Sequence, residues 1–320
     1  MTKRAGSPKT IVLFGGAGFI GRYIVREAAK RGWQINIASR DPNAALYLKT
    51  SGSVGQIAPV FANIADDDSV RAAMRGADYV VNLCGILYET GRQKFDGVHR
   101  DGADRVARIA AEMGVQRLVH ISAIGASSTS PATYAKTKAA GEQAVRNQMS
   151  DATILRPSIV FGPEDGFFNL FAGLARLAPF LPLIGGGHTR FQPVYACDVA
   201  SAVMAVLDNN ETAGKLYELG GPRTYTFKQL LQLILSEVGI KRPLIALPWS
   251  LAMVKATFLG LLPKPLLTRD QVKLLKADNV VAEDALGFKE LNIEPTAVEV
   301  IVPTYLRRFR PGGRFAPKAA

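Results

Sequence analysis

An apolar run that breaks into glycines spaced three apart constrains the fold of this chain more than any other feature. Residues 11–14 suit a buried strand, and residues 19–31 have the periodicity of a helix. In such a strand–turn–helix, the first glycine permits the turn and the second lets the backbone approach a pyrophosphate. The third glycine lets the helix pack closely on the strand.

The helix N-terminus in such a unit offers unpaired N–H groups and the positive end of its dipole to phosphate. The strand–turn–helix context therefore predicts a phosphate-binding turn, and the alternative is a glycine-rich turn that binds nothing. The predicted turn consists of Gly15, Gly16, Ala17, Gly18, Phe19, Ile20 and Gly21.

The composition indicates an ordinary globular protein, with 48% hydrophobic residues among 320. No run reaches the roughly 18 uncharged apolar residues of a membrane span. The first nine residues lack the apolar core of a signal peptide and are short for a transit peptide, so we expect a cytoplasmic protein. Cys84 and Cys197 show no metal or disulfide spacing, so we expect two buried cysteines and no metal site.

The net charge of +12 is concentrated at the two ends of the chain. Basic ends, rather than a basic face with interleaved aromatic residues, favour an anionic membrane surface or an acidic partner over nucleic acid. A solvated tail that only aids solubility is the alternative. The basic residues concerned are Lys3, Arg4, Lys9, Arg307, Arg308, Arg310, Arg314 and Lys318.

Strands and helices alternate along the first half of the chain, which predicts an α/β fold with a doubly wound parallel sheet of the NAD(P)-binding Rossmann type. Ligands of such sheets bind beyond the carboxyl ends of the strands. We expect a Rossmann domain over residues 1–165 and a smaller substrate or docking portion over residues 166–320, with residues 198–220 returning to the Rossmann core. The strands are predicted at residues 11–14, 34–39, 57–64, 78–85, 117–122 and 152–161, and the intervening helices at 19–31, 68–75, 93–113 and 134–148.

An apolar stretch over residues 246–262 carries one charge, Lys255, and is too short to span a bilayer securely. A helix lying in the membrane interface would place Trp249 at the headgroups and let Lys255 reach toward water. A buried core helix or an oligomer contact is the alternative.

Tyr134 and Lys138 lie one helical turn apart in a predicted helix that follows the fifth strand. A nearby ammonium group lowers the pKa of a phenol, which would let Tyr134 exchange a proton with a substrate hydroxyl. Lys138 could also hold a nicotinamide ribose. These two residues are the candidate catalytic pair.

With the glycine turn and this pair, residues 9–165 resemble the extended branch of the short-chain dehydrogenase/reductase superfamily. The resemblance implies that Asn63 and Ile64 flank an adenine, and that the segment from Leu83 through Cys84 to Gly85 passes under the nucleotide. The other cofactor contacts that it implies are Ser122, Tyr134, Lys138, Pro157, Ser158 and Ile159.

The tip of the second strand bears on the choice of cofactor. NAD-binding proteins place an acid there for the ribose hydroxyls, whereas an arginine accommodates the 2′-phosphate of NADP. Ser39 and Arg40 stand at this tip, which favours NADP(H), and the adjacent Asp41 leaves NAD(H) open.

The fifth strand departs from the pattern of catalytic members, which carry a serine at its end. That position aligns with Ala123, and Ser122 comes one residue earlier, where a strand directs the side chain to the opposite face. Ser127 or Ser128 in the next loop could compensate. The departure weakens the case for dehydrogenase or epimerase catalysis.

A closer resemblance links the chain to an atypical branch of the superfamily, which contains the NADPH-binding accessory subunit of respiratory complex I and its alphaproteobacterial relatives. The matching segments are residues 155–165, 167–169, 192–195, 198–199, 248–249 and 267–272.

This resemblance implies a mainly structural nucleotide and docking on the peripheral arm near the membrane and the quinone site; related members are linked to ubiquinone biosynthesis. We therefore expect an accessory or assembly protein, peripheral on the inner face of the cytoplasmic membrane. The alternatives are an NAD(P)-dependent reductase, dehydrogenase or sugar-nucleotide epimerase that uses Tyr134 and Lys138, and a redox sensor that signals through a partner.

Overall fold

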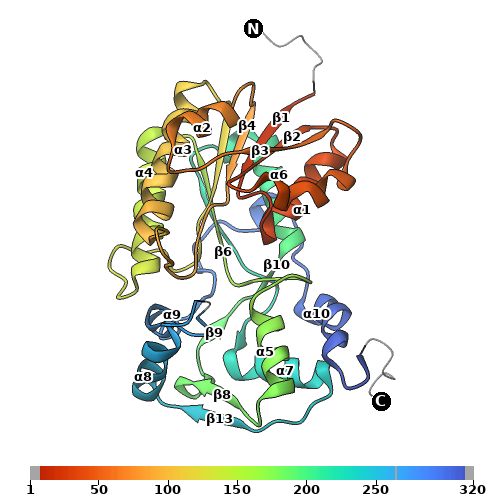
Figure 1. Cartoon of the computed structure of the whole chain (residues 1–320), viewed down its shortest axis with the longest axis vertical. Coiled ribbons are helices and arrows are strands. Elements are labelled where there is room, and N and C mark those ends of the chain that lie inside the picture. Colours follow the sequence, from red (N-terminus) through yellow and green to blue (C-terminus); the bar gives the residue numbers. More distant parts are fainter. Residues whose placement is uncertain (1–7, 264, 314–320) are drawn as a thin grey trace.

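The computed structural model describes residues 8–263 and 265–313, and its centre is a seven-stranded parallel sheet (Figure 1). The strand order is β11-β6-β5-β4-β1-β2-β3, and all neighbours are parallel. From β1 the chain first adds strands on one side and then, from β4 onward, on the other side, which confirms the doubly wound α/β fold. The strands are β1 (Thr10–Phe14), β2 (Gln34–Ser39), β3 (Ile57–Phe61), β4 (Tyr79–Asn82), β5 (Arg117–Ile121), β6 (Thr153–Pro157) and β11 (Leu216–Leu219).

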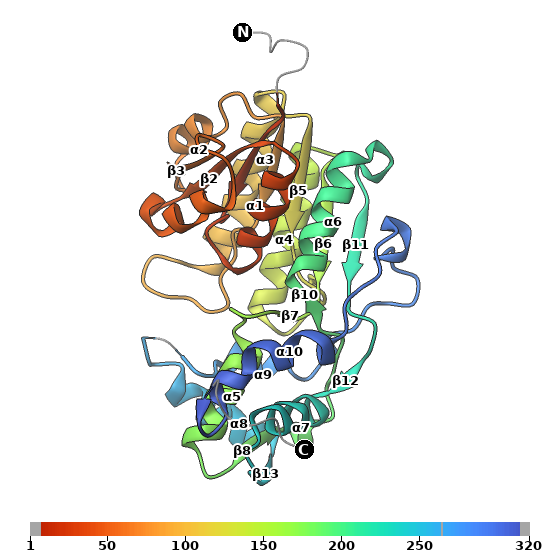
Figure 2. The ribbon, with the colours of Figure 1, turned by 90° about the vertical axis from the view of Figure 1, so that its right-hand side faces the viewer.

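Helices cover both faces of this sheet, as Figure 2 shows. Alternate residues of β1 face opposite sides: Ile11 and Leu13 join the core beneath α1 and α6, whereas Val12 and Phe14 join the core beneath α2, α3 and α4. Both faces are therefore buried, as the continuous apolar sequence of β1 requires. The helices are α1 (Phe19–Lys30), α2 (Asp67–Ala73), α3 (Gly102–Glu112), α4 (Thr133–Gln148) and α6 (Ala196–Asp208).

A smaller lobe lies beyond the carboxyl ends of the sheet strands (Figure 1) and has its own aromatic core around Phe161, Phe168 and Phe227. Three strand pairs support it: β7 (Val160–Phe161) with β10 (Val194–Tyr195), β8 (Leu181–Ile184) with β13 (Leu244–Leu247), and β9 (Arg190–Phe191) with β12 (Tyr225–Thr226). Its helices are α5 (Phe167–Leu177), α7 (Phe227–Val238), α8 (Trp249–Leu259), α9 (Arg269–Leu274) and α10 (Val298–Leu306). In residues 8–263 and 265–313, no helix has the length and apolarity needed to cross a membrane.

The chain returns to the sheet domain between these lobe segments. Helix α6 packs on α1, and β11 pairs with β6 at the edge of the sheet. The small lobe is thus assembled from the segment between β6 and α6 and from segments that follow β11.

Four predicted elements differ clearly from the observed ones. The sixth strand, predicted to end at residue 161, ends at Pro157, because Val160 and Phe161 turn away to pair with β10. The helix predicted from residue 93 begins as a π-helix, Asp96–Asp101, and continues as α3. β3 and β4 end at Phe61 and Asn82, so the predicted nucleotide contacts beyond them lie in loops.

Two arginines of the basic C-terminal end form hydrogen bonds within the fold, and the two cysteines differ from expectation. Arg308 donates a hydrogen bond of 2.6 Å to Asn169, and Arg310 donates one of 2.7 Å to the Glu237 carbonyl. Both cysteines are partly exposed rather than buried. Of the other terminal charges, Lys3, Arg4, Arg314 and Lys318 lie outside the described residues.

Candidate functional site

The glycine turn between β1 and α1 is closely packed, as Gly15 and Gly21 illustrate. Gly15 has a φ of 81°, and a Cβ there would lie 3.3 Å from the Leu83 carbonyl carbon in the loop after β4. A Cβ on Gly21 would lie 2.5 Å from the Gly16 Cα. The Gly15 N–H also donates to the Ala38 carbonyl of β2 at 3.2 Å, so the turn is held between its two neighbouring strands.

The N-terminus of α1 opens directly from this turn. Gly18 is its N-cap residue, and no described side chain caps it. The N–H groups of the first helical turn lack acceptors within the helix, and the helix dipole places partial positive charge there. An uncapped helix start beside a glycine cradle fits the diphosphate of a dinucleotide.

At the tip of β2, the neighbouring residues Arg40 and Asp41 make different contacts. The Asp41 carboxylate accepts a hydrogen bond of 3.0 Å from the Asn43 N–H, and Ser39 accepts one of 3.2 Å from the Asp41 N–H. Arg40 is exposed and lies beside Gln93. When the oxygen of the Gln93 carboxamide is turned toward Arg40, it accepts hydrogen bonds of 3.0 and 3.1 Å from the two terminal guanidinium nitrogens. Asp41 thus caps a local turn, while Arg40 stays at the edge of the site.

The loops after β3 and β4 carry the residues expected around the nucleotide. Asn63 accepts a hydrogen bond of 3.1 Å from the Ala65 N–H, and the Ile64 side chain packs against Gly102. Leu83 donates to the Phe14 carbonyl at 2.9 Å, and the Cys84 N–H donates to Asn82 at 3.1 Å. Because parallel strands end at one edge, these loops and the glycine turn lie along the same side of the sheet.

Lys138 reaches this edge from α4. Its side chain is 5% exposed, and its ammonium donates a hydrogen bond of 3.1 Å to the Ile121 carbonyl at the end of β5. The ammonium also lies 3.3 Å from where a Cβ on Gly85 would be, which places it between the loops after β4 and β5. Burial lowers the pKa of Lys138 to about 8, although Glu142 and Cys84 favour the charged form.

Tyr134, one turn before Lys138, is held by aromatic contacts. Its ring lies edge-on to His99, with centroids 5.3 Å apart, and to Phe95 at 6.0 Å. Burial raises the pKa of Tyr134 to about 12. The expectation that Lys138 lowers this pKa is therefore wrong for this structure, since burial of the phenol dominates.

His99 is a site residue that the sequence did not reveal. Its Nε2 accepts a hydrogen bond of 3.1 Å from the Ile86 N–H, so its other nitrogen carries the proton and faces the Thr137 hydroxyl at 3.0 Å. Burial lowers the pKa of His99 to about 3, which keeps the ring neutral. The π-helix brings the His99 carbonyl so close to α4 that a Cβ on Gly141 would lie 2.0 Å from it. The sequence feature that could have indicated this close contact is Gly141, a glycine inside a predicted helix.

Ser122 does not offer its hydroxyl to the cofactor edge. It is buried, and its hydroxyl donates to the Glu142 carboxylate on α4. Glu142 in turn accepts two hydrogen bonds, 2.7 and 2.8 Å, from Arg156, which also pairs with Glu218 at 3.4 Å. The Ser122 hydroxyl is thus engaged by Glu142, and Ala123 follows with only a methyl group.

A second residue missed by the sequence, Asn279, joins the ends of β5 and β6. Its side-chain oxygen accepts hydrogen bonds from the Ser158 hydroxyl at 2.7 Å and the Ile159 N–H at 3.1 Å. Its amide donates to the Ile124 carbonyl at 3.2 Å. Pro157, the last residue of β6, pairs with Leu219 of β11. The segment expected to border a nicotinamide is thus fixed by a residue of the small lobe.

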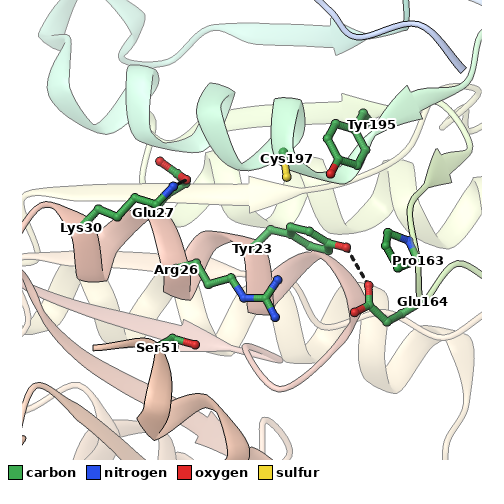
Figure 3. Close-up of a pocket in the computed structure, with 9 residues that line it drawn as sticks. All are labelled: Tyr23, Arg26, Glu27, Lys30, Ser51, Pro163, Glu164, Tyr195 and Cys197. Carbon is green, nitrogen blue, oxygen red and sulfur yellow. Dashed lines mark hydrogen bonds and ion pairs between the residues drawn. The ribbon is translucent and has the colours of Figure 1, made fainter. Parts of the chain in front are cut away.

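A cavity of about 470 Å³ lies elsewhere, where α1 meets the small lobe and the start of α6 (Figure 3). The Tyr23 hydroxyl donates to Glu164 there at 2.6 Å, and Arg22 pairs with the same carboxylate at 3.1 Å. None of its lining residues belongs to the predicted cofactor set. The cavity is lined by Tyr23, Arg26, Glu27, Lys30, Ser51, Pro163, Glu164, Tyr195 and Cys197.

The sheet order, the glycine turn and the Tyr134–Lys138 pair together define an atypical extended short-chain dehydrogenase/reductase. The model of the NAD dependent epimerase/dehydratase family matches residues 11–220. The chain belongs to this family.

Comparisons with individual proteins are consistent with this assignment. The chain is 36% identical over 313 residues to the Arabidopsis thaliana protein named NADH dehydrogenase [ubiquinone] 1 alpha subcomplex subunit 9, mitochondrial. The matched region covers 94% of this chain and 78% of that relative. It is 29% identical to the ceramide reductase of Caulobacter vibrioides, over 74% of this chain and 73% of that protein. The NADPH-dependent quinone oxidoreductase QOR2 of Escherichia coli, solved with NADPH, shares the fold with a TM-score of 0.73 at 20% identity, over 92% of this chain and 99% of that one.

Proposed function

We propose that this protein binds a nicotinamide dinucleotide as a mainly structural cofactor and acts as an accessory or assembly subunit of a respiratory NADH:ubiquinone oxidoreductase. One observation carries the proposal: the glycine turn is intact, whereas the Ser122 hydroxyl is bound to Glu142 and Ala123 follows it. A dehydrogenase of this class needs a hydroxyl at the end of the fifth strand to hold the reacting oxygen. The nucleotide anchor is therefore more complete than the catalytic machinery.

Individual residues support dinucleotide binding in distinct ways. The uncapped N-terminus of α1 would hold the diphosphate, and the buried ammonium of Lys138 would donate to a ribose hydroxyl. A bound nicotinamide supplies hydride transfer chemistry. The small-lobe residue Asn279 fixes Ser158 and Ile159, which would border the ring, so cofactor binding would tie the two lobes together.

The tip of β2 supports NADP(H) over NAD(H). Asp41 uses its carboxylate on the Asn43 N–H, so it is engaged rather than presented to ribose hydroxyls. Arg40 is exposed, and its guanidinium lies beside the Gln93 carboxamide, whose oxygen would orient it. A planar guanidinium at this position suits the 2′-phosphate of NADP.

The proposed partner comes from the name of the Arabidopsis relative, a subunit of NADH dehydrogenase. Together with the resemblance across the small lobe, it favours docking on a membrane-associated respiratory complex at the inner face of the cytoplasmic membrane. A link to ubiquinone biosynthesis is the variant of this proposal in which the partner is a quinone-modifying enzyme.

Two measurements test the proposal. Affinity purification of the tagged chain from detergent-solubilised membranes should recover respiratory-complex subunits, and mass spectrometry of the native protein should find NADPH that exchanges slowly. Recovery of quinone-modifying enzymes instead would select the variant. A protein that carries no nucleotide, or that recovers neither kind of partner, would overturn the proposal.

A catalytic reductase is the second candidate, and the specific observation in its favour is the intact pair of Tyr134 and Lys138. The Caulobacter relative is named a reductase. If this chain reduces a carbonyl substrate with NADPH, Tyr134→Phe should abolish turnover and leave nucleotide affinity unchanged. Absence of turnover by the parent protein on such substrates would remove this candidate.

A further inference from the structure

One face of α8 presents apolar side chains to solvent. Leu251, Val254 and Phe258 follow the spacing of a single helix face, and Phe258 is 69% exposed. Ala252 and Ala256, on the opposite face, are buried against the small lobe. A helix that is apolar on both sides is normally covered on both. The outer side of α8 therefore lacks a cover within the described chain.

The exposed apolar surface continues beyond the helix into the turn that follows it. Leu261 is 81% exposed, and Leu262 is exposed as well. We call the surface formed by Leu251, Val254, Phe258, Leu261 and Leu262 the α8 face. Figure 1 shows α8 on the flank of the small lobe, beneath α9.

The chain segment that carries α8 is basic. Residues 238–269, which include β13 and α8, contain no aspartate or glutamate. Lys255 is exposed and lies among the apolar side chains of the face. The basic residues of this segment are Lys241, Arg242, Lys255, Lys264 and Arg269.

This combination of charge and apolarity favours one kind of partner over others. In a second copy of the chain, the same positive charges would face each other, which opposes self-association through the α8 face. An anionic membrane surface instead attracts the lysines and arginines and accepts the apolar side chains below the headgroups. A lysine among apolar residues can lay its methylene groups along the apolar region and keep its ammonium at the phosphates.

We propose that the α8 face binds the surface of a membrane containing anionic phospholipid, with Phe258 and Leu261 inserted among the headgroups. The inference adds a direct lipid contact to the proposed function. It rests on α8 and its surrounding charges, so it requires neither a bound nucleotide nor a respiratory partner.

Vesicle flotation with the full chain tests this contact. The protein should float with vesicles of phosphatidylcholine and phosphatidylglycerol, not with phosphatidylcholine alone, and added salt should weaken the binding. Phe258→Asp should reduce the bound fraction at least about tenfold, because it places a charge in the inserted face. Lys255→Glu should reduce it less. Val54→Asp changes a fully exposed apolar residue outside the small lobe and should bind like the parent.

Three outcomes would overturn the inference. The first is absence of flotation with the anionic vesicles, and the second is equal flotation of Phe258→Asp and the parent. The third is the formation of concentration-dependent dimers that Phe258→Asp abolishes, because such dimers would show that a second copy of the chain covers the α8 face. Thermal unfolding of each variant shows whether it is folded. Nucleotide content and recovery of respiratory subunits are measured separately, so failure of the proposed function would leave the vesicle result standing.

Discussion

The Asp270 carboxylate accepts a hydrogen bond of 2.8 Å from the backbone N–H of Tyr134, and its second oxygen accepts one of 2.7 Å from Thr133. The N-cap residue of α4 is Ala132, which has no side-chain oxygen to offer. A carboxylate from α9 in the small lobe therefore caps the helix that carries Tyr134 and Lys138. It also places negative charge at the positive end of the helix dipole.

Replacement of this remote cap should destabilise the protein measurably. Asp270→Ala leaves two backbone N–H groups without their acceptor, and we expect the free energy of unfolding to fall by about 1–2 kcal/mol. Asp270→Asn keeps one acceptor oxygen and should lose less. Denaturant titration measures both effects, and Asp284→Ala, at an exposed aspartate, should stay within about 0.5 kcal/mol of the parent. Equal stabilities of the Asp270→Ala and Asp284→Ala variants would show that the cap contributes nothing.

The close packing of the glycine turn leads to a second prediction. A Cβ added in Gly21→Ala would lie 2.5 Å from the backbone of Gly16, so the turn must shift. We expect at least about tenfold weaker nucleotide binding and a loss of about 1–3 kcal/mol in the free energy of unfolding. Isothermal titration calorimetry with NADPH measures the affinity. Gly166→Ala is the matched control, because a Cβ there meets no described atom within 4 Å; nucleotide affinity that is the same in both variants would contradict the prediction.

Cofactor selectivity gives a third prediction, which rests on the proposed function. Arg40→Ser removes the guanidinium at the tip of β2, and the loss of a charge-assisted contact should weaken NADPH binding about ten- to a hundredfold. NADH lacks the 2′-phosphate, so its affinity should change little. Gln93→Leu removes the carbonyl that orients Arg40 and should produce a smaller loss of the same kind. A parallel loss for both nucleotides would mean that Arg40 does not read the 2′-phosphate.

The local features of the fold could be predicted from the sequence because they depend on neighbouring residues. The glycine spacing predicted the turn before α1, and the alternation of strands and helices predicted the sheet. The break after Pro157 was missed, because an apolar run does not show that its last residues pair with a strand of another lobe. The apolar pattern of a segment shows that it is buried, but it does not show which strand the segment pairs with, because that depends on the tertiary fold.

The candidate site shows the same division. The positions of Tyr134 and Lys138 on one helix follow from their spacing, and the difference between Ser122 and Ala123 follows from the geometry of a strand. The contacts of Asp270 with Tyr134 and of Asn279 with Ser158 join residues more than a hundred positions apart. No local pattern marks such residues, so the sequence could not show that the small lobe fixes the site.

The buried histidines predict how stability depends on pH. His120 is 1% exposed, its Nδ1 lies 3.3 Å from the Asn82 amide, and its Nε2 has no hydrogen-bond partner among the described residues. Burial lowers the pKa of His120 to about 3, with the positive charge of Lys138 as a further cause. In the unfolded chain the same group has a pKa of about 6.5. Between these values the unfolded state binds more protons than the folded state.

The free energy of unfolding should therefore be highest above about pH 6.5 and fall as the pH is lowered toward about 3. His99, whose pKa burial also lowers to about 3, adds to the same slope. His120→Gln removes one of the two groups and should flatten the dependence, even if it also lowers stability at neutral pH. Urea titrations at intervals between about pH 7 and pH 4 measure the slope. If the variant and the parent lose stability in parallel over this range, His120 is not one of the groups that must be protonated on unfolding.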